Sequence, residues 1–139
     1  MPVSPMNRAL RILRDEHRSI SAVLHGMRHL AHASGDGAVQ PDFDVFRAML
    51  RYLDEFPERL HHPKEDSFLF ARLAERALDA LPVIEILHAE HVEGRRRLRD
   101  IERALEQFER SWPHWSGPFI AAIDDYAEFH RRHMLREER

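Results

Sequence analysis

The sequence predicts an all-α protein, an antiparallel four-helix bundle with up-down-up-down topology, on three observations. First, only five glycines and eight prolines interrupt long stretches of Leu, Ala, Arg and Glu, which are good helix formers. Second, the apolar/polar alternation of β-strands is absent. Third, the connections between the helical stretches are short, which favours antiparallel neighbours.

The helical stretches are bounded by breakers. Ser4 and Pro5 form a helix start, and SGDGAVQ ends this helix after about Ala33. The other predicted helices span about 41–74, about 82–111 and about 116–139. At 139 residues we expect a single domain, 1–139.

Histidines and carboxylates lie on the apolar stripes that must face the neighbouring helices. Residues three and four apart share a helix face, so each stripe can be read directly. The stripes are, helix by helix, Leu10, Leu13, His17, Ile20, Leu24, Met27 and Ala31; Phe46, Leu50, Leu53, His61, Glu65 and Phe68; Ile84, Leu87, His91, Gly94, Leu98, Ile101, Leu105, Phe108 and Trp112; and Phe119, Ile123, Tyr126, His130, His133 and Glu137.

One stripe histidine from each helix falls at a common level. In an antiparallel bundle His17, His61, His91 and His133 lie about 16, 19, 20 and 16 residues from the same end. At about 1.5 Å per residue these are all roughly 24 to 30 Å from that end. We therefore expect four imidazoles to meet inside the bundle.

The composition limits what this cluster can be. There is no cysteine, so a metal must be held by nitrogen and oxygen donors. The formal charge is −3 and no basic field is present, which argues against nucleic acid as a partner. No apolar run reaches the roughly 20 residues that span a bilayer, and the opening segment lacks a signal-peptide core, so we expect a cytoplasmic protein without membrane contact.

Two His-x-x-x-Glu pairs, His61 with Glu65 and His133 with Glu137, each place an imidazole and a carboxylate on one helix face. Buried carboxylates need a positive partner, and no Lys or Arg lies on the stripes. A divalent cation would supply that charge.

The chain resembles the hemerythrin-like, or HHE cation-binding, family. The motifs that carry the resemblance are DEHR around His17, HHPKED from His61, AEHVEG around His91 and HMLREE from His133. The resemblance implies a non-haem di-iron centre inside the bundle, with two iron ions, although zinc or another divalent metal would suit the same donors. It implies that Glu65 and Glu137 bridge the two metals. The expected metal ligands are His17, His61, Glu65, His88, His91, His133 and Glu137.

This chain departs from the family pattern in its spacing. Oxygen-carrying members have two third-helix histidines four residues apart, whereas His88 and His91 are three apart. His62 and His130 are further candidates for ligands or for hydrogen bonding to ligands. The chain ends two residues after Glu137, so we expect this carboxylate to be loosely held. The other histidines are predicted to lie on the surface: His25, His29, His32 and His114.

The resemblance implies binding or sensing of dioxygen, nitric oxide, peroxide or iron, rather than an enzyme with catalytic residues of its own. A sensor would need a protein partner or a second copy of the chain. One alternative is a ferritin-like di-iron carboxylate oxidase, based on two Glu-x-x-His motifs, Glu58 with His61 and Glu85 with His88, and on Glu16. The other is a structural or interaction bundle that a metal stabilises.

Overall fold

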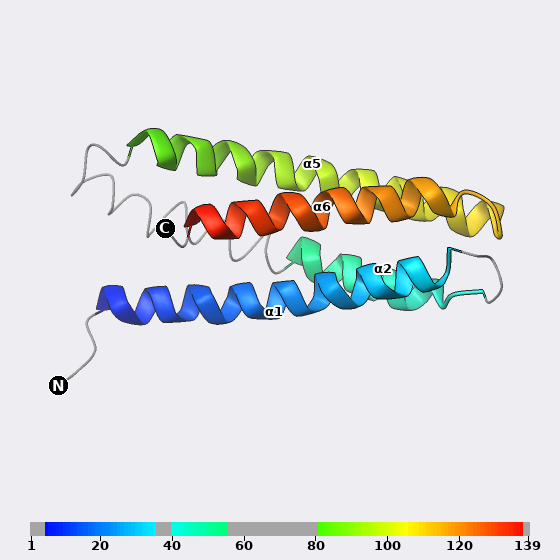
Figure 1. Cartoon of the computed structure of the whole chain (residues 1–139), viewed down its shortest axis with the longest axis horizontal. Coiled ribbons are helices and arrows are strands. Elements are labelled where there is room, and N and C mark those ends of the chain that lie inside the picture. Colours follow the sequence, from blue (N-terminus) through cyan, green and yellow to red (C-terminus); the bar gives the residue numbers. More distant parts are fainter. Residues whose placement is uncertain (1–4, 36–39, 56–80, 138–139) are drawn as a thin grey trace.

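A computed structural model describes residues 5–35, 40–55 and 81–137 (Figure 1). All regular structure within these ranges is helical. The helices are α1 (Pro5–Ala33), α2 (Phe43–Leu53), α5 (Leu81–Ser111) and α6 (Ser116–Glu137). The predicted starts of the second, third and fourth helices lie within about two residues of the observed ones. The predicted continuation of the second helix to about residue 74 falls almost entirely outside the described residues.

Local sequence explains where two of these helices begin. Pro5 opens α1, where its missing N–H costs nothing and its fixed φ suits a first helical turn. Asp42 caps α2 from an extended backbone (φ −79°, ψ 99°), and its side chain accepts a hydrogen bond from the backbone N–H of Asp44 at 3.0 Å. These caps satisfy or remove backbone donors that the helix itself leaves without partners.

The described helices pack side by side as a bundle in which chain neighbours are also spatial neighbours. α1 packs along α6, α5 along α6, and α2 contacts both α1 and α5. Figure 1 shows α1 and α6 running in opposite directions, with the turn between α5 and α6 at the same end as the α1–α2 connection. The all-α prediction and the antiparallel arrangement of the helices are thereby confirmed.

The predicted stripes form the core. The stripe residues of α1 from His17 to Ala31 and those of α2 up to Leu53 are buried, and Leu98, Ile101 and Phe108 of α5 are at most 1% exposed. Ile123 and Tyr126 of α6 are fully buried. The helical period of the sequence therefore identified the inward face of each described helix.

An aromatic cluster closes the end of the bundle where α5 turns into α6. The rings of Phe43 and Phe108 meet edge to face with centroids 5.4 Å apart, and Phe46 meets Phe119 in the same way at 5.0 Å. Trp112 packs on Phe43 at 6.3 Å. Edge-to-face pairs of this kind add about 0.5–1.5 kcal/mol each beyond their buried area. The histidine level lies nearer the opposite end, so the aromatic cluster and the histidine cluster occupy different parts of the bundle.

Ion pairs join neighbouring helices on the outside. Arg47 of α2 donates to both oxygens of Glu109 on α5 at 2.6 and 2.7 Å, which raises the pKa of the guanidinium. Arg28 and His32 of α1 both reach Asp124 of α6, at 2.8 and 3.0 Å. Exposed pairs of this kind contribute little to the free energy of folding, but they fix the pairing of adjacent helices.

The arginines of α5 pair with carboxylates on the outer face of the helix or stack on a neighbouring ring. Arg96 pairs with Glu93 and Asp100, and Arg99 pairs with Glu102. Arg97 also reaches Glu93 and stacks over Phe129, with its guanidinium carbon 4.7 Å from the ring centroid. None of the helices in the described part of the chain combines the length and the apolar character that crossing a bilayer requires.

Candidate metal centre

Imidazoles from three helices meet around one buried carboxylate, that of Glu137 at the end of α6. His17 of α1, His91 of α5 and His133 of α6 are between 1% and 4% exposed. The side chain of Glu137 is itself only 4% exposed. The register worked out from the sequence placed these three histidines at one level, and in the structure all three contact Glu137.

The two oxygens of Glu137 face different histidines. Oε2 lies 2.9 Å from Nε2 of His17. Oε1 contacts Nε2 of His133 and lies 3.4 Å from Nε2 of His91. The carboxylate therefore stands between an α1 histidine on one side and an α5–α6 pair on the other.

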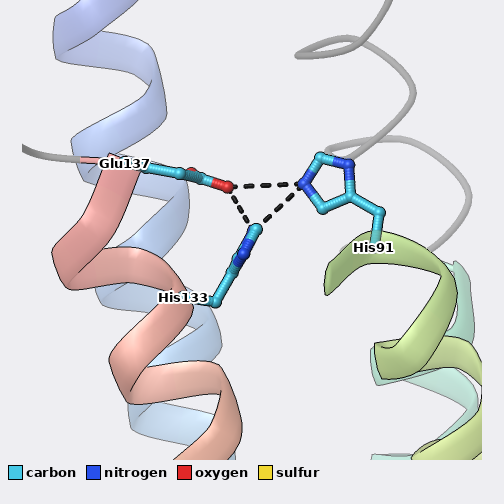
Figure 2. Close-up of side chains that lie close together, drawn as sticks. All are labelled: His91, His133 and Glu137. Carbon is cyan, nitrogen blue, oxygen red and sulfur yellow. Dashed lines mark hydrogen bonds and ion pairs between the residues drawn. The ribbon is translucent and has the colours of Figure 1, made fainter. Parts of the chain in front are cut away.

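The α5–α6 side has three converging donor atoms (Figure 2). Nε2 of His91, Nε2 of His133 and a carboxylate oxygen of Glu137 all lie within 4.8 Å of one another, and the two nitrogens are 3.0 Å apart. Two imidazoles and one carboxylate are a donor set that proteins use for non-haem iron and for zinc. The residues present therefore fit a divalent cation.

The electrostatics of the cluster favour positive charge. Burial by itself lowers the pKa of the His133 imidazole, but hydrogen bonds with Glu137 and Glu90 outweigh burial, and the pKa of His133 lies above its ordinary value. Two carboxylates thus hold a proton on this ring where burial would remove it. A metal cation would supply the same positive charge, and the nitrogen and oxygen atoms that would bind it already converge.

Glu90 of α5 is a contact that the sequence analysis did not anticipate. Its Oε1 lies 3.2 Å from Nδ1 of His133, on the side of the ring away from Glu137. Glu90 immediately precedes His91, one position off the apolar stripe. The antiparallel register that pairs His91 with His133 brings this part of α5 close to α6, but only the rotation of α5 decides which neighbour of His91 reaches α6; Val92, on its other side, is 60% exposed.

His88 and His130 differ in burial. His88 is exposed, and its ring centroid is 6.5 Å from that of His91. It does not belong to the group of converging donors found among the described residues. His130 is buried at 1% exposure, between Tyr126 and His133, with ring centroids 5.7 and 6.0 Å away. His130 therefore packs against the cluster, whereas His88 faces solvent.

The remaining site predictions concern surface histidines, residues outside the described ranges, and how firmly Glu137 is held. The four histidines predicted to lie on the surface are exposed: His25, His29, His32 and His114. His61, Glu65, His62 and Glu58 lie outside the described residues, so their assignment stays a prediction. The expectation that Glu137 is loosely held does not match its buried side chain and its contacts with three imidazoles.

Comparison with known families agrees with this geometry. Residues 8–139 match the family described as hemerythrin HHE cation binding domain. The match covers α1 from its fourth residue, all of α2, α5 and α6, and every described residue of the histidine and carboxylate cluster. No curated protein and no solved structure gives a significant match.

Proposed function

Because the chain belongs to the hemerythrin HHE cation binding domain family, we propose that it is a non-haem di-iron protein. It binds or senses dioxygen, nitric oxide, peroxide or iron itself at the His/Glu centre. The proposed ligands are His17, His91, His133 and Glu137 from the described helices, with His61 and Glu65 from the segment between them.

The observation that carries the proposal is that the two oxygens of the Glu137 carboxylate face different histidines. One oxygen faces His17 at 2.9 Å, and the other faces His91 and His133. A carboxylate that offers one oxygen to each of two groups of imidazoles is suited to bridge two cations. A single cation would need only the group formed by His91, His133 and Glu137.

Each residue has a distinct part in this centre. Reduced iron held by imidazoles and carboxylates, with a coordination position left open, binds dioxygen, nitric oxide or peroxide. His17 supplies a nitrogen from α1, and the His91–His133 pair supplies two nitrogens from α5 and α6. Ile20, Leu87 and Tyr126, which are at most 3% exposed, belong to the buried core of the helices that carry the cluster. This apolar surrounding limits the access of water and favours the charged metal–ligand contacts.

A surface groove reaches one residue of the centre, His17. A surface groove of about 310 Å³ between α1 and α6 is lined by His17 together with Arg14, Arg131 and Met134. His17 therefore joins the groove to the buried carboxylate, which it contacts. This arrangement favours a centre that exchanges small molecules over a closed structural metal site.

The ferritin-like alternative has less support. It requires Glu85 and His88 to act as ligands, and both are exposed on α5. Glu16, its expected ligand from α1, is half-buried and lies off the stripe that carries His17. Those bundles direct their Glu-x-x-His motifs inward.

The test is anaerobic reconstitution with ferrous iron, followed by a count of iron per chain and an optical spectrum before and after oxygen is admitted. We expect about two irons per chain, as in a centre bridged by carboxylates, and a new near-ultraviolet band on adding oxygen. A band that bleaches when oxygen is removed indicates reversible binding, and an irreversible one indicates oxidation or sensing chemistry. One tightly held zinc without spectral response would refute the di-iron proposal.

Four alanine variants test the ligand assignment. His61→Ala and Glu65→Ala should each abolish binding of one or both metals, because they remove donors predicted to face the centre. His25→Ala and His29→Ala are matched controls, since both histidines are exposed on α1. Equal loss of metal in all four variants would contradict the assignment.

A further inference from the structure

His133 has a carboxylate at each of its two ring nitrogens. Nε2 points into the cluster, where it contacts Glu137 and lies 3.0 Å from Nε2 of His91. Nδ1 points the other way and lies 3.2 Å from Oε1 of Glu90. The two carboxylates come from different helices, Glu137 from α6 and Glu90 from α5.

An ionised carboxylate only accepts hydrogen bonds, so each of the two carboxylates favours a hydrogen on the ring nitrogen that it faces. A ring that binds a cation through Nε2 must carry its single hydrogen on Nδ1, where Glu90 can accept it, and the lone pair is then on Nε2. That lone pair then faces the carboxylate oxygen and the His91 nitrogen with which Nε2 forms the donor group.

Glu90 is itself held in place. Its side chain is 17% exposed, and Arg136 of α6 lies on its outer side, with Nε 3.8 Å from the oxygen that accepts from His133. The guanidinium approaches this carboxylate from α6 and adds a second contact between the two helices. Contacts from Arg136 of α6 to Glu90 of α5, and from Glu90 to the ring of His133, thus join the two helices.

We propose that Glu90 is a positioning residue for the metal centre, which fixes the orientation and tautomer of His133 so that Nε2 is presented as a metal donor. In proteins, histidines that bind metals commonly donate their other ring N–H to a carboxylate in this way, and removal of that carboxylate costs 10- to 100-fold in metal affinity. The metal-binding part of this inference rests on the proposed function. The tautomer part rests on the contact between Glu90 and His133 alone.

The test compares Glu90→Ala, Glu90→Gln and the control Glu106→Ala. Glu106 is also on α5 but is 67% exposed and pairs only with the exposed Arg110 among the contacts described. The first readout is the ¹⁵N spectrum of the His133 ring in metal-free protein, at a pH where the ring is neutral. We expect Glu90→Ala to carry less of the hydrogen on Nδ1 than wild type and Glu106→Ala, because it lacks the carboxylate that Nδ1 contacts.

Glu90→Gln separates positioning from bulk and charge. Its amide oxygen can still accept from Nδ1–H, so we expect the wild-type tautomer to be retained. The second readout is the Zn²⁺ affinity of each variant by chelator competition. We expect a loss of about 10- to 100-fold in Glu90→Ala, a smaller loss in Glu90→Gln and less than about 2-fold in Glu106→Ala.

The experiments distinguish a failure of the positioning role of Glu90 from a failure of the proposed function. If Glu90→Ala leaves both the tautomer and the Zn²⁺ affinity as in wild type, the positioning role is refuted even though the protein binds metal. If wild type binds no Zn²⁺ and no iron, the proposed function fails, and with it the metal-binding part of the inference; the ¹⁵N spectra then still decide whether Glu90 sets the tautomer.

Discussion

Replacement of Glu137 by Gln is the most informative change to the centre, because it keeps the shape of the side chain and removes its charge. The carboxylate of Glu137 contacts imidazoles from α1, α5 and α6, and its side chain is 4% exposed. In metal-free protein the amide can still hydrogen-bond these rings. The loss is the difference between a charge-assisted hydrogen bond and a neutral one, about 1–1.5 kcal/mol.

The larger effect is on metal binding. A ligand that binds only the folded chain at 100 times its dissociation constant adds about 2.7 kcal/mol to the free energy of unfolding. For 139 residues, at about 2.1 cal/mol/K per residue, the entropy of unfolding is about 290 cal/mol/K. Saturating metal should therefore raise the Tm of the wild type by about 9 °C. In Glu137→Gln this increase should largely vanish.

Differential scanning calorimetry with and without Zn²⁺ separates the two contributions. The Tm of each metal-free protein gives the cost of the lost charge, and the increase on adding Zn²⁺ gives the binding contribution. His25→Ala is the control, since His25 is exposed on α1. If Zn²⁺ raises the Tm of Glu137→Gln as much as that of wild type, the assignment of the centre to Glu137 is wrong.

Three further predictions concern α5, the surface and the core. His88→Ala should cost far less Zn²⁺ affinity in a chelator titration than His91→Ala, because His88 is exposed and His91 is buried; equal losses would contradict this. Hydrogen bonds from Arg96 and Arg131 lower the pKa values of Glu93 and Glu128 from 4.5 to about 2, so the stability they contribute is full above about pH 4.5 and is lost as the pH falls toward 2. Urea titrations across this range should show the decline, and 1 M salt should weaken it, whereas stability that rises on acidification would refute it. Phe119→Ala should lower the free energy of unfolding by about 3–5 kcal/mol, because it empties a fully buried position in the aromatic cluster, and a urea titration that shows less than about 1 kcal/mol would contradict this packing.

For the part of the chain that the structure describes, the sequence alone determined the helices, their buried faces and the level of three of the four histidines. A helix repeats every 3.6 residues and rises 1.5 Å per residue, so a stripe such as His17, Ile20 and Leu24 identifies the buried face without any tertiary information. The antiparallel register then placed His91 and His133 opposite each other. The predicted continuation of the second helix, with His61 and Glu65, lies outside the described residues.

Only the tertiary structure decided how the side chains of the centre meet. Glu137 directs its two oxygens to different histidines, and Glu90, one position off the stripe, reaches the outer nitrogen of His133. His88 and His130 each lie one turn from a cluster histidine, yet the first is exposed and the second buried. A residue's angle around its own helix is known from the sequence, but such contacts depend on how neighbouring helices are rotated and spaced and on side-chain rotamers, which are fixed only when the whole bundle packs.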